Sequence, residues 1–404
     1  VVLEDVPGDG VAFETETRFG IDGEPAAAEP SEGAGLQSVV QGNTAFAVDL
    51  YRRLSEEPGN LFVSPYSISL ALGMTYGGAR GNTALEMAAA LHFPESQEAL
   101  HPALKDLTRR LLETASATGQ KLDIANGLCL TGGGVSPEYK SLLENSYDAE
   151  LFAGSVDKIN AWVNDKTEGK IDKILEQLSP NSVCVLLNAI YFKSLWESQF
   201  EKSNTRNAPF MVSPGKEVSV PLMYQKCSLR ILHKEKFQAA SIPYKGGKMS
   251  MIILLPDDVD GLPALEKQLS AQSLAQWLGE LDKAFSEEIS FFLPKYKLET
   301  EYDLVSHFKA LGMLDAFDSS GKADFTGMGW RKGELWISQV KHKAFVEVNE
   351  EGTEAAAATA VEMVTKQAGR PRVFRADHPF LFLIRDNETG ALLFLGRLVN
   401  PAAA

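Results

Sequence analysis

The segment from Glu350 to Lys366 places the strongest constraint on how this chain can fold. Every second residue of it is small or apolar: Thr353, Ala355, Ala357, Thr359, Val361, Met363 and Thr365. This alternation suits a β-strand with one buried face. The four consecutive alanines also suit a helix, and they offer no large side chain to anchor a core. The segment is therefore predicted to change its conformation, and an alanine-rich surface linker is the alternative.

The neighbouring sequence favours the first interpretation. Residues 335–348, upstream of the segment, have the composition of a strand, and residues 380–398 are predicted to form two apolar strands around a turn at 386–390. The segment therefore connects two strands of the predicted core as an exposed loop that could itself join a sheet.

Two motifs in this region resemble those of the serpin family. The first resembles the hinge of the reactive-centre loop: Glu350, Glu351, Gly352, Thr353, Glu354, Ala355, Ala356, Ala357 and Ala358. The second, residues 374–384, is similar to the family signature that follows this loop, and the likeness extends over about residues 43–402. The resemblance implies an α+β fold with a large, mainly antiparallel central sheet, further sheets, about eight to nine helices and an exposed reactive-centre loop at about 350–375.

The resemblance also assigns structural roles inside the fold. It implies a polar "shutter" beneath the central sheet, made of Ser64, Pro65, Ser67, Asn188 and His342, and a "breach" at Trp196 where loop insertion begins. Sequence reasoning alone gives plainer alternatives. Ser64 and Pro65 also suit an ordinary capped helix, and Trp196 suits a buried structural residue.

The implied function is that of a suicide substrate for a protease, and not that of an enzyme. The sixteenth residue after Glu350 is Lys366, so the resemblance implies a reactive bond between Lys366 and Gln367 and a serine protease of trypsin-like specificity as partner. Subtilisin-like, elastase-like and cysteine proteases are further candidate partners. The alternative is a non-inhibitory serpin that acts as a carrier or chaperone, but the small residues of the hinge favour an inhibitor. The protein is expected to act as a monomer.

Charge and composition limit the other partners. The net charge is −15, and residues 1–42 are predicted to be an acidic, disordered tail before a single domain at 43–404. An acidic surface argues against nucleic acid or heparin as a partner. The sequence contains no apolar run near the roughly eighteen residues needed to span a bilayer.

Cysteine and histidine patterns predict neither a disulfide framework nor a bound group. Cys129, Cys184 and Cys227 are odd in number and far apart, and the six histidines show no metal-ligand spacing, so no metal and no cofactor are expected. A secreted or extracytoplasmic location is favoured over a cytoplasmic one. Asn387 begins a glycosylation sequon. Only residues 153–158 separate Phe152 from the helix predicted near Ile159, which is shorter than is common in serpins and implies a shortened strand or helix there.

Overall fold

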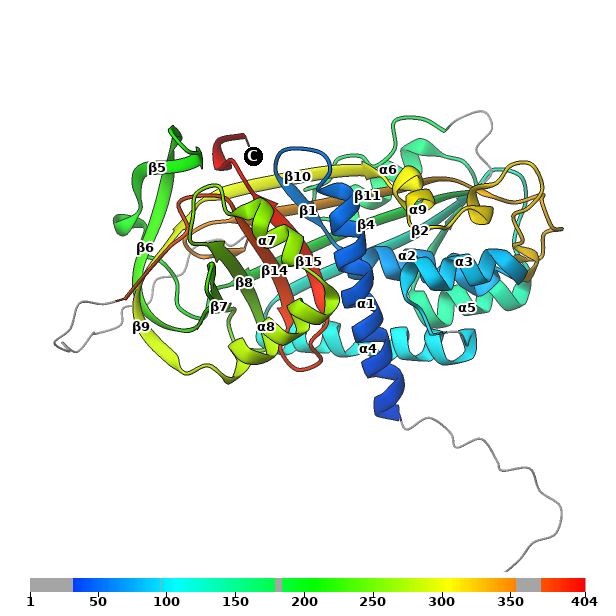
Figure 1. Ribbon diagram of the computed structural model, residues 1–404. Coiled ribbons are helices and arrows are strands. Elements are labelled where there is room, and N and C mark those ends of the chain that lie inside the picture. The colour runs from blue at the N-terminus through cyan, green and yellow to red at the C-terminus, as the bar shows by residue number, and fades with distance from the viewer. Residues whose placement is uncertain (1–31, 95, 179–183, 354–371, 404) are drawn as a thin grey trace, which may run out of the picture.

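The computed structural model describes residues 32–94, 96–178, 184–353 and 372–403, which form two β-sheets flanked by helices (Figure 1). This arrangement confirms the predicted α+β class. The helices are α1 (Glu32–Leu54), α2 (Pro65–Gly78), α3 (Gly81–Leu91), α4 (Gln97–Thr118), α5 (Pro137–Tyr147), α6 (Val156–Lys166), α7 (Leu262–Gln268), α8 (Ala271–Lys283) and α9 (Val305–Ala310).

The central sheet is mainly antiparallel, as predicted. Its strands, in spatial order, are β10 (Tyr296–Asp303), β11 (Ile337–Val348), β12 (Gly352–Thr353), β4 (Cys184–Leu195), β2 (Lys121–Leu130) and β3 (Glu150–Phe152). The pairs β11–β4 and β2–β3 are parallel. Strand β4 has a nearly continuous apolar sequence, which fits a strand that is covered on both faces.

The second sheet holds the signature motif. Its spatial order is β1 (Leu61–Val63), β15 (Leu392–Leu398), β14 (Phe380–Asp386), β8 (Met249–Pro256), β7 (Phe237–Pro243), β6 (Lys216–His233), β9 (Ser286–Pro294) and β13 (Arg372–Arg375), and β5 (Arg206–Ser213) also pairs with β6. Every residue of β8, β14 and β15 is buried. These three strands therefore lie at the centre of the core.

Helix α2 lies between the two sheets and contacts both β4 and β15. All of its residues are buried. The Ser64 side chain caps its first turn by accepting a hydrogen bond from the Ser67 backbone N–H, and Pro65 occupies the first helical position, where its missing N–H costs nothing. This capped start is the one predicted from the sequence. It also fixes the position of two shutter residues.

Helix α1 begins earlier than predicted. The folded domain was expected to start at residue 43, but the helix begins at Glu32, so the predicted boundary between residues 42 and 43 lies within it. Val39 and Val40 are buried and Leu36 packs against the core, a spacing that continues the apolar face by one more turn. The glycines of this stretch, Gly33, Gly35 and Gly42, concealed that pattern. The predicted disorder of residues 1–31 lies outside the described residues.

The shortened segment before Ile159 leaves β3 with three residues and α6 with eleven. Ile159 and Val163 of α6 are nevertheless fully buried against the central sheet, in a cluster that includes Val185 and Leu187 of β4. The Asn160 amide also holds the chain after the helix, because its Oδ1 accepts hydrogen bonds from the backbone of residues 174 and 175. The short helix therefore still covers the sheet.

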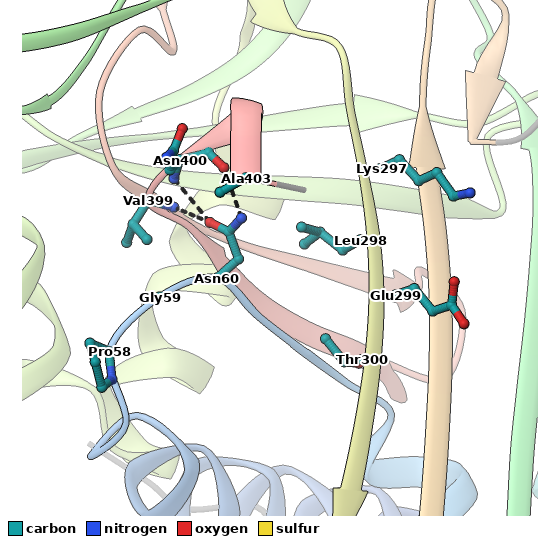
Figure 2. Close-up of a pocket in the computed structure, with 10 residues that line it drawn as sticks. All are labelled: Pro58, Gly59, Asn60, Lys297, Leu298, Glu299, Thr300, Val399, Asn400 and Ala403. Carbon is teal, nitrogen blue, oxygen red and sulfur yellow. Dashed lines mark hydrogen bonds between the residues drawn. The ribbon is translucent and has the colours of Figure 1, made fainter. Parts of the chain in front are cut away.

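The C-terminal segment is fixed next to β1 by one amide side chain (Figure 2). Asn60 Nδ2 donates to the Asn400 carbonyl at 2.8 Å, and Asn60 Oδ1 accepts from the backbone N–H groups of Val399 and Asn400. A hollow of about 550 Å³ lies between these residues and β10. Leu298 points towards it, whereas Lys297 points away (Figure 2) and lies over the Phe345 ring.

Candidate reactive-loop insertion site

Strands β11 and β4 separate at one end of the central sheet. Over most of their length β11 and β4 pair directly, with residues 337–344 opposite 184–190. Beyond that point β12 lies between them: Gly352 pairs with Leu195, and Thr353 pairs with both Ser194 and Val348. The predicted insertion site therefore already holds the first two residues of the incoming strand.

Only glycine fits at position 352. A Cβ built on Gly352 would lie 2.0 Å from the Ser194 carbonyl oxygen and 2.7 Å from Leu195 Cα. Both contacts involve the backbone of β4, so no side-chain rearrangement could relieve them. The close approach of β12 to β4 therefore depends on this glycine.

Thr353 turns inward and is 1% exposed. Its Oγ1 lies 2.7 Å from the Tyr244 hydroxyl oxygen, and the Tyr244 ring stacks on Trp196 with 4.8 Å between centroids. Burial raises the pKa of Tyr244 well above its ordinary value, although the hydrogen bond with Thr353 opposes that effect. The phenol is therefore neutral, and it can both donate and accept a hydrogen bond here.

Trp196, the residue predicted to form the breach, joins the hinge to the central sheet. Its indole N–H donates to the Asn349 carbonyl at 3.0 Å, and its backbone N–H donates to the Glu351 carbonyl at 2.9 Å. The Asn349 side chain in turn accepts from the backbone N–H groups of Glu351 and Gly352. These bonds hold the chain in the turn that leads from β11 into β12.

Glu350 and Glu351 are nearly buried and each contacts a lysine. Glu350 lies 2.8 Å from Lys295 Nζ and accepts a hydrogen bond from Thr205 Oγ1, also at 2.8 Å. Glu351 lies 2.6 Å from Lys202 Nζ. Burial alone would raise the pKa of Glu350, but the hydrogen bonds from Lys295 and Thr205 outweigh it and lower that pKa. The hydrogen bond to Glu351 raises the pKa of Lys202.

The predicted shutter residues also meet. His342 of β11 and Asn188 of β4 lie opposite each other, with 2.7 Å between His342 Nδ1 and Asn188 Oδ1. Asn188 Oδ1 accepts a second bond from Ser67 Oγ at 2.7 Å, and the Ser64 hydroxyl donates to the Leu393 carbonyl. Pro65 contributes only the start of α2. The sequence did not identify Asn126 of β2, which accepts from Asn188 Nδ2 at 3.0 Å.

The hydrogen bonds of His342 define its tautomer. Its Nε2 accepts from the Ser64 backbone N–H, so the ring proton of the neutral imidazole must be on Nδ1, from which it is donated to Asn188. Complete burial lowers the pKa of His342 to about 3. At neutral pH the ring is therefore uncharged, and its two polar atoms join α2, β4 and β11.

Sequence reasoning missed the partners of the hinge. Thr205, Lys202, Lys295 and Tyr244 come from distant parts of the chain and match no short motif. One indirect signal was present, since two adjacent acids followed by a buried strand require cationic partners. The remaining hinge residues, Glu354, Ala355, Ala356, Ala357 and Ala358, and the predicted reactive bond between Lys366 and Gln367 lie outside the described residues.

Comparison with known proteins identifies this architecture. A family model described as "Serpin (serine protease inhibitor)" matches residues 41–401. The chain belongs to the serpin family. The leukocyte elastase inhibitor of Equus caballus is 40% identical over 387 residues, which cover 91% of this chain and 100% of that protein. Serpin B6 of Macaca fascicularis is 41% identical over 388 residues, with the same two coverages. This serpin is therefore a member of a family of protease inhibitors and not an enzyme.

A solved serpin structure has the same fold. Human thyroxine-binding globulin in complex with thyroxine superimposes with a TM-score of 0.83 at 28% identity, covering 91% of this chain and 100% of that one. The relatives named above lend no support to the secreted location expected from the sequence. Within the described ranges, no helix is long and apolar enough to cross a membrane.

The cysteines of the serpin are free thiols. Cys129 and Cys184 are buried and Cys227 is partly buried. Burial raises the pKa of all three, that of Cys227 to about 12. They are therefore protonated and unreactive at neutral pH. In the part of the chain that the structure describes, no group of three or more His, Cys, Asp or Glu side chains is arranged to hold a metal ion.

Proposed function

We propose that this serpin inhibits serine proteases as a suicide substrate. The observation that carries the proposal is the position of Gly352 and Thr353, which lie between β11 and β4 as the start of a new strand. The residues that follow Thr353 on the same parity are small, so they could continue along the same buried face. The name of the leukocyte elastase inhibitor supports a serine protease as the partner.

In the proposed reaction, the protease serine attacks the carbonyl of Lys366 and forms an acyl-enzyme. The cut loop then extends β12 and separates β11 from β4 over residues 337–344 and 184–190. A new central strand pairs on both sides. At about 0.5 to 1.5 kcal/mol net per hydrogen bond, a strand of roughly fourteen residues that pairs on both sides releases on the order of 10 kcal/mol after the lost β11–β4 bonds are subtracted. This is comparable with the stability of a whole domain, so the uncut form is kinetically trapped.

The shutter opposes this step. His342 and Asn188 lie directly opposite each other on β11 and β4, so a strand inserted between them would move them to second neighbours, roughly 9.5 Å apart. The hydrogen bond between His342 Nδ1 and Asn188 Oδ1 must then break. Shutter opening is thus part of the barrier that keeps the intact loop out of the lower sheet.

We assign the reactive bond to Lys366–Gln367, because the lysine would fill an acidic specificity pocket of a trypsin-like protease. Incubation with trypsin should produce a covalent complex that survives denaturing electrophoresis, and the released fragment should begin at Gln367 by mass spectrometry. A fragment beginning at Val373, or cleavage without a covalent complex, would contradict the assignment. Elastase, subtilisin and a cysteine protease tested in parallel show whether the partner range is broader.

The second candidate function is that of a non-inhibitory carrier. The complex of thyroxine-binding globulin with its ligand shows that a protein of this fold can bind a small molecule. The hinge argues against this role here, since carriers have no need of small residues at Thr353, Ala355 and Ala357. The trypsin incubation separates the two functions: a carrier would be cut without forming a complex.

Activation by heparin is not part of the proposed function. The arginines of α4 are already paired, Arg109 with Glu113 at 2.7 Å and Arg110 with Asp106 at 2.8 Å. These pairs neutralise the helix surface that a polyanion would need. The inhibition rate is therefore expected to be the same with and without heparin.

A further inference from the structure

A groove between α3 and the start of α4 exposes apolar side chains to solvent. Its volume is about 1040 Å³. Leu85, on its wall, is 68% exposed. A single exposed leucine is ordinary, but an apolar cluster in a groove is a candidate contact surface. The apolar lining consists of Tyr76, Ala79, Ala84, Leu85, Ala88, Ala89 and Phe93, and polar residues line the rest of the groove.

The chain enters the fold close to this groove. Helix α1 begins at Glu32 and crosses α4 (Figure 1). A Cβ built on Gly35 would lie 3.8 Å from Ala103 Cβ of α4. Gln97, in the groove wall, precedes Ala103 by six residues, or about 9 Å along the helix. Residues 1–31 therefore lead into α1 roughly 10 Å from the groove.

This leading segment contains a strict alternation of its own. Between residues 11 and 21 the odd positions are apolar or threonine: Val11, Phe13, Thr15, Thr17, Phe19 and Ile21. The even positions include Glu14, Glu16 and Arg18. An extended segment with this pattern has one apolar face and one charged face. Such a face needs an apolar surface to cover it.

We propose that residues 11–21 lie extended in the groove between α3 and α4, with Phe13 and Phe19 against its apolar wall. The ten residues from 22 to 31 can span up to about 33 Å, which is more than enough to reach it. The hollow beside Asn60 (Figure 2) is a poorer fit, because it lies past the far end of α1, about 35 Å away along that helix. The segment is thus an intramolecular cover for α3.

A photo-cross-linker tests this placement in the full-length protein. Benzoylphenylalanine replaces Leu85 in the groove or, as a matched control, Leu112, which is also an exposed leucine at 41% but lies on α4 outside the groove. After irradiation, the probe at position 85 should form a monomeric product whose cross-linked peptide contains residues 11–21. The probe at position 112 should yield little of this product. The double variant Phe13→Ser, Phe19→Ser should reduce the yield at position 85 several-fold.

Two results would overturn the proposal. The first is equal cross-linking to residues 11–21 from both positions, or none from either. The second is a cross-linked dimer whose yield rises with protein concentration, which would mean that a second copy occupies the groove. Hydrogen exchange supplies an independent measurement without a probe. The amides of α3 should exchange several-fold more slowly in the unaltered chain than in the double serine variant, and equal rates would contradict the placement.

Discussion

Substitution of Thr353 by arginine tests the mechanism most directly. Thr353 is 1% exposed, its hydroxyl faces the Tyr244 phenol at 2.7 Å, and its backbone pairs with both β11 and β4. Arginine at this position would place a cation among Tyr244, Trp196 and the core without an acidic partner on that face. We therefore expect Thr353→Arg to drive β12 out of the sheet in the resting protein.

The free-energy cost of Thr353→Arg follows from the burial of the Thr353 side chain. Loss of the bond to Tyr244 costs about 1 kcal/mol, and an unpaired buried cation costs several kcal/mol more. Insertion after cleavage must pass through this position first. If only 2 to 3 kcal/mol of the penalty remains in the transition state, insertion slows by about 30- to 150-fold. Water then has time to hydrolyse the acyl-enzyme before the loop is inserted.

The assay is the ratio of covalent complex to cleaved serpin after incubation with trypsin. Thr353→Arg should be cut at the same bond but released mostly as cleaved protein. Thr353→Val retains the size and should change the ratio only slightly. The matched control is Glu354→Arg, because residue 354 falls on the opposite parity, which an inserted strand would turn away from the face that Thr353 occupies. A wild-type ratio for Thr353→Arg would show that this residue does not control insertion and would refute the reasoning.

Three further predictions concern stability and modification. The pKa of His342 falls to about 3 in the folded protein, so between pH 6.5 and 3 the unfolded chain binds one more proton than the folded chain. The contribution of neutral His342 to the free energy of unfolding is therefore complete above pH 6.5 and falls by about 1.4 kcal/mol per pH unit below it. Urea unfolding at pH 7.5 and 5 should show this loss, and His342→Gln should reduce it. A double-mutant cycle of Glu350→Ala and Lys295→Ala should give a coupling of about 1.5 to 3 kcal/mol, and additive effects would contradict the ion pair. In a secretory host Asn387 should be glycosylated, by intact mass, because it is exposed in a turn and the glycan is added before folding; the folded glycoprotein should then be less stable in urea, since the bare Nδ2 donates to the Gly247 carbonyl and to Ser250 Oγ.

The alternation of the loop could be read from the sequence because it is a local property. Parity alone indicated which residues of the loop would share a buried face, and Thr353, which belongs to that set, is buried against Tyr244. The same holds for the start of α2, where Ser64 and Pro65 form a capping pattern within a few residues. Local patterns of this kind depend on backbone geometry, which is the same in every protein.

The timing of insertion was not predictable from the sequence. Parity shows which face a strand would present, but it does not show that Gly352 and Thr353 are already in the sheet before cleavage. That depends on the ion pairs of Glu350 and Glu351 with Lys295 and Lys202, which lie 55 and 149 positions away, respectively. No local pattern encodes such distant pairs. The early start of α1 was missed for another reason, since three glycines concealed its apolar spacing.

The breach and the shutter have opposite effects on β11 and β4: the first separates the two strands and the second joins them. At the breach, Trp196 and the ion pair of Glu350 hold β11 and β4 apart with β12 between them. Ten residues before Gly352, the hydrogen bond between His342 and Asn188 holds the same strands together. A loop that inserts gains backbone hydrogen bonds with each residue added. It must also break the buried hydrogen bond between His342 and Asn188 early, because that pair lies about ten residues along β11 from the start of insertion. Under the proposed mechanism the shutter is therefore part of the barrier to insertion, and substitutions there should change the rate of insertion more than the stability of the inserted product, in which His342 and Asn188 would be apart.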